Sequence, residues 1–269
     1  MNVGLIGCGA IGSLLYDLLG RYAPGVRVQV VYERTESRER ARKALGTGTG
    51  TRIVDSVDDL LDGELDLVVE CAGHEALRNL GPSVLAAGHD LLVASVGALA
   101  DPVLETLLID AATAKGARLR IPSGALGGLD ALGAAKFAGL REVRYESHKA
   151  PDAWRGTPAE ALVALDDIMR PTAFYEGTAR DAARLFPQNA NVAAAVALAG
   201  IGFDQTKVVL NADPLATGNA HRIKAQGDFG EIDIAVSGKT LPSNPKTSML
   251  APHSLVRAIV DLTRTLVVA

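Results

Sequence analysis

Short apolar runs alternate with longer, helix-like segments over the first 122 residues of the chain. The runs have the length and apolar character of buried strands, and they occupy residues 3–6, 26–32, 51–54, 66–70, 91–96 and 117–121. The longer segments between them are predicted to be helices, and the one at 103–115 has its apolar residues on one face. This order of strand and helix is typical of a parallel, doubly wound α/β sheet.

The pattern changes after residue 122. Residues 129–137 form an alanine-rich helical segment, and residues 142–148 alternate between polar and apolar positions, which is typical of a strand with one exposed face. Three further strands are expected at 207–211, 220–227 and 231–237, the last two joined by a turn short enough for a hairpin. The sequence therefore predicts an α+β domain with a mixed, partly antiparallel sheet.

We expect the domain boundary at residue 122. Residues 1–122 are predicted to form a Rossmann dinucleotide-binding domain, and residues 123–249 a catalytic and dimerisation domain. The closing segment, 250–269, contains an amphipathic helix expected at 252–267. We expect this helix to pack back on the first domain.

A glycine-rich turn follows the first apolar run. Gly7, Gly9 and Gly12 give the pattern G-x-G-x-x-G, directly after a strand and at the start of a helix. Gly7 allows the tight turn, Gly9 lets a pyrophosphate approach the backbone, and Gly12 allows close packing of helix on strand. With Ala10 and Ile11 between them, these residues are predicted to bind a dinucleotide at the helix N-terminus. The alternative is a glycine-rich turn that binds nothing.

Two strand ends are candidates for further contacts with this cofactor. Glu33 closes the second strand, where an acidic residue binds the adenosine ribose. Arg34 follows directly, and it could accept a 2′-phosphate or be a solvated loop charge. The pair leaves open whether the cofactor is NAD or NADP. Cys71 and Ala72 follow the strand at 66–70, at the sheet edge where ligands of open α/β sheets bind.

The composition excludes several classes of function. The 269 residues are 48% hydrophobic with a net charge of −4, which argues against nucleic acid or an anionic membrane surface as the main partner. The two cysteines lie in apolar strand-end contexts, so we expect free thiols in a reducing compartment. No signal-peptide pattern opens the chain, and its longest apolar run, 192–203, is short for a membrane span. A soluble cytoplasmic protein without a metal site is expected.

The second domain should present a substrate to the nicotinamide. His221 lies on the strand expected at 220–227, and a neutral imidazole can take the proton lost when hydride leaves a substrate. Arg222 follows and could bind a carboxylate. A structural histidine fits the same pattern, and His148 and His253 are weaker candidates.

Several long segments give the chain a resemblance to a known family. They are GLIGCGAIG at 4–12, VASVGALAD at 93–101, IPSGALGGLDAL at 121–132, FPQNANVAAAVALAGIGFD at 186–204, NAHRIKAQGDFGEI at 219–232 and NPKTSMLAPHS at 244–254. On these segments the chain resembles the L-aspartate dehydrogenases over nearly its whole length. The resemblance implies NAD(P)-dependent oxidative deamination of L-aspartate to iminoaspartate, or the reverse amination of oxaloacetate.

The resemblance also implies roles for single residues. It makes His221 the catalytic residue, and it places Ala125 and Asn191 against the cofactor, with Asn189 as the alternative asparagine. Glu33 departs from the family's pattern, in which an aspartate is expected. The two carboxylates of aspartate need cationic or hydroxyl partners, and the candidates by residue type are Ser123, Arg222, Lys246 and Thr247.

Other functions share the two-domain plan. One is a reductase of the dihydrodipicolinate or homoserine dehydrogenase kind, and another is an NAD(P)-binding regulator without turnover. An open second sheet in a two-domain dehydrogenase commonly forms a two-fold interface, so we expect a homodimer. The product could supply iminoaspartate to NAD biosynthesis, or the enzyme could simply deaminate aspartate.

Overall fold

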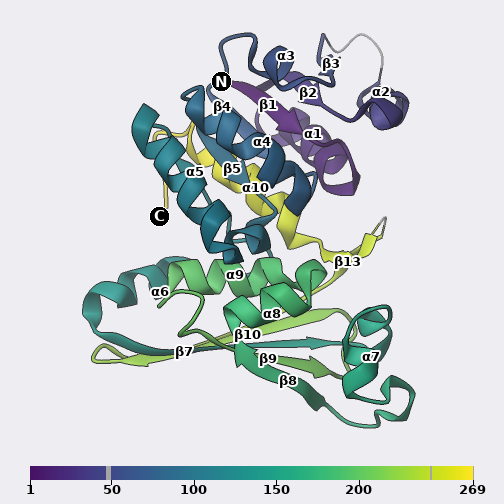
Figure 1. The fold of residues 1–269 in the computed structure, drawn as a ribbon, viewed down its shortest axis with the longest axis vertical. Coiled ribbons are helices and arrows are strands. Elements are labelled where there is room, and N and C mark those ends of the chain that lie inside the picture. Colours follow the sequence, from purple (N-terminus) through teal and green to yellow (C-terminus); the bar gives the residue numbers. More distant parts are fainter. Residues whose placement is uncertain (47–49, 243, 269) are drawn as a thin grey trace. The chain divides into compact units, whose positions relative to one another are not determined.

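The computed structural model describes residues 1–46, 50–242 and 244–268 (Figure 1). The chain divides into two compact units. The first contains Met1–Pro122 and Ala251–Ala269, and the second contains Ser123–Leu250. No helix of the described residues is long and apolar enough to cross a membrane.

The first unit is built on a six-stranded sheet in which all neighbouring strands are parallel. The strand order is β3-β2-β1-β4-β5-β6, so the chain starts in the centre and winds first to one edge and then to the other. The strands are β1 (Asn2–Ile6), β2 (Arg27–Tyr32), β3 (Arg52–Val54), β4 (Leu67–Glu70), β5 (Leu91–Val93) and β6 (Leu119–Arg120). The predicted parallel, doubly wound sheet is confirmed.

Helices flank this sheet. They are α1 (Ala10–Tyr22), α2 (Arg38–Leu45), α3 (Val57–Leu61), α4 (His74–Ala86), α5 (Pro102–Lys115) and α10 (Leu250–Asp261). The ends of α5 follow from local sequence. The Asp101 carboxylate accepts the Val103 N–H at 3.0 Å, Pro102 fills the first helical position, and Gly116 ends the helix with φ of +69°.

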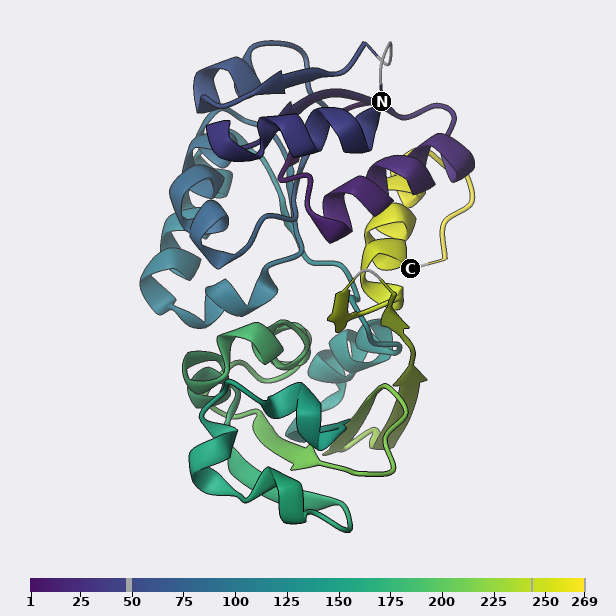
Figure 2. The same cartoon turned by 90° about the vertical axis from the view of Figure 1, so that its right-hand side faces the viewer.

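The closing helix α10 belongs to the core of the first unit. Leu255 and Ile259 are buried in the same cluster as Leu15 and Leu19 of α1 and Val3 of β1. Figure 2 shows α10, in yellow, beside α1, in purple. The helix ends at Asp261, six residues before the predicted end at 267.

The second unit contains a five-stranded mixed sheet. Its order is β11-β10-β7-β9-β8, and only the central pair β7–β9 is parallel. The strands are β7 (Leu140–Lys149), β8 (Thr172–Thr178), β9 (Lys207–Ala212), β10 (Asn219–Gly227) and β11 (Gly230–Gly238). The hairpin between β10 and β11 closes at Gly227 and Gly230, so the predicted mixed sheet with an antiparallel hairpin is confirmed.

Three strands were not expected from the sequence. Strand β8 lies at the sheet edge and is half-exposed along its length, so it lacks the clean period-two pattern that marks β7. The segment near residue 245 contains β13 (Asn244–Ser248), which pairs with the short β12 (Thr240–Leu241). Strand β8 pairs with β9, about 30 residues away, and β12 and β13 are too short for a pattern of alternation to mark them.

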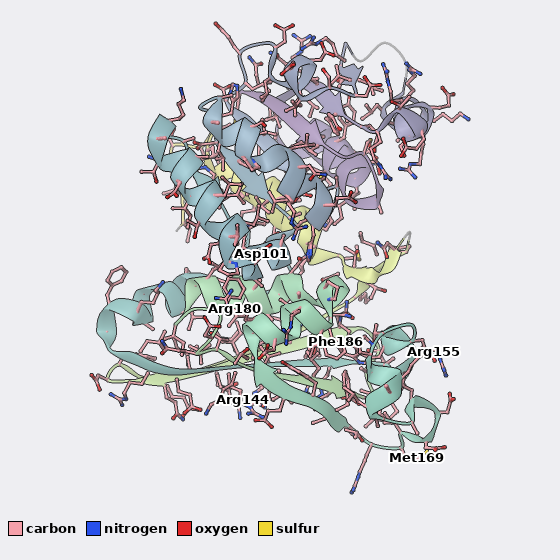
Figure 3. The ribbon with its side chains drawn as sticks, viewed as in Figure 1. Asp101, Arg144, Arg155, Met169, Arg180 and Phe186 are labelled. Carbon is pink, nitrogen blue, oxygen red and sulfur yellow. The ribbon has the colours of Figure 1, made fainter. Side chains whose placement is uncertain are left out.

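The two faces of the second sheet differ. Helices α6 (Leu129–Ala135), α8 (Ala179–Leu185) and α9 (Ala190–Ala199) lie against one face, and the short α7 (Ala159–Leu162) lies near one end (Figure 1). Trp154 and Phe186 are buried among aromatic rings in this unit. The other face is charged, and Figure 3 shows Arg144 on it, away from the helices. Arg144 binds Glu146 and Glu176 there, each at 2.8 Å.

Candidate functional site

The glycine turn joins β1 to α1. Gly7 has a φ of +93°, which glycine adopts without strain, and Gly9 is the N-cap residue of α1. The Ser13 N–H donates to the Gly9 carbonyl at 2.9 Å, so the helix begins directly after the turn. The free N–H groups of the first turn, which includes Ala10, Ile11 and Gly12, are therefore available for an anion.

Space around the three glycines differs in a way that fits a bound pyrophosphate. A Cβ at Gly7 would lie 2.7 Å from the Ala72 Cβ, and a Cβ at Gly12 would lie 2.2 Å from the Gly7 carbonyl oxygen. A Cβ at Gly9 would meet no protein atom within 4 Å. Gly7 and Gly12 are thus required by the fold, whereas the space over Gly9 is left open.

A pocket of about 300 Å³ opens beside this turn. It is lined by Gly7, Gly9, Tyr32, Glu33, Arg34, Arg40, Cys71, Ala72, Glu75, Ala76, Asn79 and Leu80. The structure thus brings together six of the residues predicted to bind the cofactor. Ala10, Ile11 and Gly12 follow at the start of α1. Arg40 and the α4 residues were not predicted, because nothing local in the sequence directs α2 and α4 toward the turn.

The carboxylate of Glu33 is tied to the glycine turn. Its Oε2 accepts the Cys8 N–H at 2.8 Å, and the side chain is largely buried. Arg34 is exposed and pairs with Glu36 at 3.3 Å. Arg40 is a second guanidinium in the lining, held to Ser37 at 3.2 Å. Glu33 therefore lines the pocket together with two guanidinium groups.

Glu70, at the end of β4, is a fully buried carboxylate that holds two loops. It accepts the N–H groups of Ala72 and Gly73, each at 2.8 Å, and both the N–H and the hydroxyl of Ser95, at 3.0 and 2.9 Å. Burial raises its pKa, and these bonds oppose the rise. Glu70 therefore fixes the Cys71–Ala72 crossing. From the sequence, Glu70 was predicted only as the last residue of a strand.

Replacement of Gly9 by alanine tests the pyrophosphate assignment. Gly9 has an extended backbone with φ of −78°, and its missing Cβ faces open space, so alanine should fold normally. We expect Gly9→Ala to weaken NADH binding by about tenfold or more, because the methyl group occupies the place of a phosphate. Fluorescence titration with NADH measures this.

Gly20→Ala is the matched control, since Gly20 lies in α1 and its added Cβ also meets no atom within 4 Å. The control should bind NADH as the wild type does. Unchanged affinity in Gly9→Ala would remove Gly9 from the cofactor site.

His221 lies on the buried face of the second sheet. It is 5% exposed, and strand β10 buries alternate residues, so His221 and Arg222 point to opposite faces. The His221 Nδ1 lies 2.8 Å from the Tyr145 hydroxyl oxygen on β7. The other ring nitrogen, Nε2, has no hydrogen-bond partner among the described residues.

The protonation states of this pair follow from burial. Burial, and secondly the charge of Lys149, lower the pKa of His221 to about 3. Burial also raises the pKa of Tyr145, and a hydrogen bond with Ser147 partly opposes that rise. At neutral pH the structure therefore holds a neutral imidazole beside a protonated phenol.

Lys149 is a charged neighbour that sequence reasoning missed. It is 7% exposed and ends β7 on the same face as Tyr145 and Ser147. Its Nζ donates to the Asn189 Oδ1 and lies 5.2 Å from the centre of the Trp154 ring. A signal existed in the sequence, because Lys149 is in phase with the buried positions of an alternating strand.

The remaining predicted residues are dispersed within the second unit. Ala125 is buried, whereas Ser123 and Asn191 are exposed. Thr247 is half-buried in β13, and the side chain of Lys246 lies outside the described residues.

Arg222 does not share a face with His221. It is exposed and forms a two-point ion pair with Asp233, at 2.7 and 2.5 Å. The structure therefore gives no support to Arg222 as a carboxylate partner beside His221. The period-two alternation of the strand already contained this information, because adjacent residues of a strand face opposite ways.

A doubly wound sheet with an open glycine turn, joined to a unit that carries a buried neutral histidine, defines a nicotinamide-dependent oxidoreductase. Comparison with known proteins agrees. Residues 7–122 match the family described as homoserine dehydrogenase, NAD binding domain, and residues 130–262 match the family described as aspartate dehydrogenase, C-terminal.

Curated relatives are similar over nearly the whole chain. The L-aspartate dehydrogenases of Cupriavidus necator and Pseudomonas aeruginosa are 45% and 44% identical to it, each over 96% of both chains. The crystal structure of aspartate dehydrogenase from Thermotoga maritima matches with a TM-score of 0.77 at 27% identity, covering 100% of this chain and 99% of that one.

A homoserine dehydrogenase from Thiobacillus denitrificans shares the fold, with a TM-score of 0.65 at 19% identity over 98% of this chain and 73% of that one. The chain belongs to the L-aspartate dehydrogenase family. It is an oxidoreductase that uses NAD or NADP and acts on a small molecule.

Proposed function

We propose that the protein catalyses the reversible oxidative deamination of L-aspartate to iminoaspartate, which is then hydrolysed to oxaloacetate and ammonia. His221 is the general acid and base of this reaction. The observation that carries the proposal is a buried, neutral imidazole whose Nδ1 is bound by Tyr145 and whose Nε2 has no partner among the described residues.

The order of proton transfers follows from the bonding of His221. For Nε2 to accept a proton, Nδ1 must carry the ring hydrogen and donate it to the Tyr145 oxygen. Nε2 then takes one proton from the substrate ammonium, which leaves an amine whose lone pair forms the C=N bond as hydride leaves C2. The cofactor, when bound, accepts that hydride. His221 passes this proton to solvent before the hydrolysis begins. It then takes a proton from the water that adds to C2 of the iminium and returns it to the nitrogen, so that ammonia leaves while the new hydroxyl loses its proton to solvent and the C=O bond forms.

The first unit supplies the binding of the cofactor. We assign the pyrophosphate to Gly7, Gly9 and the first turn of α1, and the adenosine ribose to Glu33. Cys71 and Ala72 border the same pocket. Ala125 and Asn191 remain predicted cofactor contacts from the second unit, with Asn189 as the alternative.

Domain roles, assembly and location are part of the same proposal. Residues 1–122 with 250–269 form the dinucleotide-binding domain, and residues 123–249 form the catalytic domain and the interface of a homodimer. The enzyme works in the cytoplasm and could supply iminoaspartate to NAD biosynthesis. Ser123 and Thr247 remain candidates for contacts with the substrate.

Cofactor choice is expected to depend on the charge of Glu33. Glu33→Gln keeps an oxygen for the Cys8 N–H but removes the charge that repels a 2′-phosphate, while Arg34 and Arg40 still line the pocket. We expect the kcat/KM ratio of NADP to NAD to rise by about tenfold, the worth of one charge-assisted contact. Steady-state kinetics with both cofactors measure this.

Glu39→Ala is the control, because Glu39 is exposed on α2 and pairs with Arg42 outside the pocket lining. It should leave the ratio unchanged. An unaltered ratio in Glu33→Gln would show that Glu33 does not reach the ribose.

Absorbance of the reduced nicotinamide tests the proposed reaction. The wild-type protein should reduce its cofactor with L-aspartate, but not with homoserine or without an amino acid. Reduction with homoserine instead would favour the homoserine dehydrogenase reaction. If the absorbance did not change with any of these additions although NADH bound measurably, the protein would instead be a regulator without turnover.

A further inference from the structure

Lys149 is a cation on the buried face of the second sheet, and the proposed reaction gives it no role. Lys149 ends β7 and is 7% exposed. Burial lowers its pKa from 10.5 to about 8, so the side chain is still largely an ammonium at pH 7. A positive charge is therefore held inside the unit.

No carboxylate of the described residues lies within ion-pair distance of this ammonium. Its contacts are the neutral Asn189 side chain and the face of Trp154. The acids of β11, Glu231 and Asp233, are exposed, and Asp233 binds Arg222, while Glu142 of β7 binds Lys207. Glu142, Arg144 and Glu146 lie on the opposite face of β7 from Lys149.

A buried charge without a counter-charge opposes folding. Because the folded pKa of Lys149 lies below its ordinary value, stability rises with pH between about 8 and 10.5, and the whole cost is present below pH 8. Replacement by an apolar residue would relieve that cost. A negative ligand bound at this point would supply the missing charge.

The position of Lys149 in the sheet indicates that such a ligand would lie beside His221. Lys149 lies on the same buried face of β7 as Tyr145, whose hydroxyl contacts His221, and its charge lowers the His221 pKa. A carboxylate bound by Lys149 would therefore lie beside the proton acceptor. It would also neutralise the ammonium and so make His221 more basic when substrate is present.

We propose that Lys149 is the anchor for one carboxylate of the substrate, with Asn189 holding its side chain in place. The proposal rests on the proposed reaction at His221, and it names the group that positions a dicarboxylic amino acid there. Trp154 contributes a π-face against the ammonium and no competing negative charge.

Three variants test the anchor. Lys149→Met removes the charge, Lys149→Arg keeps it, and Lys207→Met is the matched control on the other face of the sheet. We expect Lys149→Met to raise the KM for L-aspartate by about 30-fold or more, with NADH affinity unchanged. Lys149→Arg should recover part of this loss, and Lys207→Met should behave as wild type.

Comparison of L-aspartate with L-asparagine identifies the bound carboxylate. If Lys149 holds the side-chain carboxylate, Lys149→Met loses its preference for aspartate over asparagine. If it holds the α-carboxylate, both substrates weaken equally. Either result supports the anchor.

Thermal unfolding separates this role from a structural one. The melting temperature of Lys149→Met at pH 7 should equal or exceed that of the wild type, because the buried charge is gone. A lower melting temperature with unchanged KM would overturn the proposal. A fall in kcat alone, without rescue by arginine, would also overturn it, since it would make Lys149 a proton carrier.

Calorimetry with succinate keeps the anchor testable if L-aspartate is not turned over. With NADH present, wild-type protein should bind succinate, and Lys149→Met should bind it at least about 30-fold more weakly. Succinate binding without aspartate turnover would reject the proposed reaction and keep the anchor. Equal succinate affinity in both proteins would reject the anchor.

Discussion

His221→Ala should lower the turnover of L-aspartate by about 100-fold or more, the usual contribution of a general acid–base group. The physical reason is that the substrate ammonium must lose a proton before hydride can leave C2, and Nε2 of His221 is the acceptor free to take it. The cofactor pocket of the first unit contains no part of this histidine, so NADH affinity should not change. Initial rates and NADH titrations measure the two effects separately.

His148→Ala is the matched control for this variant. His148 lies on β7, faces away from the buried side and binds Asp213 at 3.2 Å. The control should keep wild-type turnover. Wild-type turnover in His221→Ala, with His148→Ala also unaffected, would exclude His221 from the proton transfer.

Glu70→Ala should lower the free energy of unfolding by about 3 kcal/mol or more, because each buried donor left without an acceptor costs about 1–3 kcal/mol. The variant leaves three backbone N–H groups and the Ser95 hydroxyl without their carboxylate. Loosening of the Cys71–Ala72 crossing should also weaken NADH binding. Urea denaturation and NADH titration measure these losses.

Glu64→Ala provides the comparison within the same unit, because Glu64 is exposed and precedes β4. It should change the free energy of unfolding by less than about 0.5 kcal/mol. If Glu70→Ala were as stable as Glu64→Ala, the four bonds to Glu70 would not hold the two loops together.

The sequence predicted those features that are encoded locally. The glycine turn could be assigned because each glycine meets a separate steric requirement within six residues of chain. Gly7 and Gly12 indeed have no room for a Cβ, and Gly9 has open space. The β10–β11 hairpin was predicted for the same reason, since its turn is short and flanked by alternating strands.

Features that join distant residues were not predicted. Glu70 acquires its importance from Ser95, and Lys149 acquires its polar partner from Asn189, 40 residues away. The sequence shows their residue types but not that their side chains meet. Arg222 is the opposite case, because its residue type suits a carboxylate whereas its phase along β10 places it on the exposed face beside Asp233.

The most direct test of the proposed mechanism is the protonation state of His221. Nuclear magnetic resonance of protein labelled with ¹⁵N-histidine, assigned with the His221→Ala variant, reports both ring nitrogens at pH 7. We expect a neutral ring with hydrogen on Nδ1, donated to Tyr145, and with Nε2 unprotonated. A protonated imidazolium, or a neutral ring with hydrogen on Nε2, would contradict the assignment of His221 as the proton acceptor.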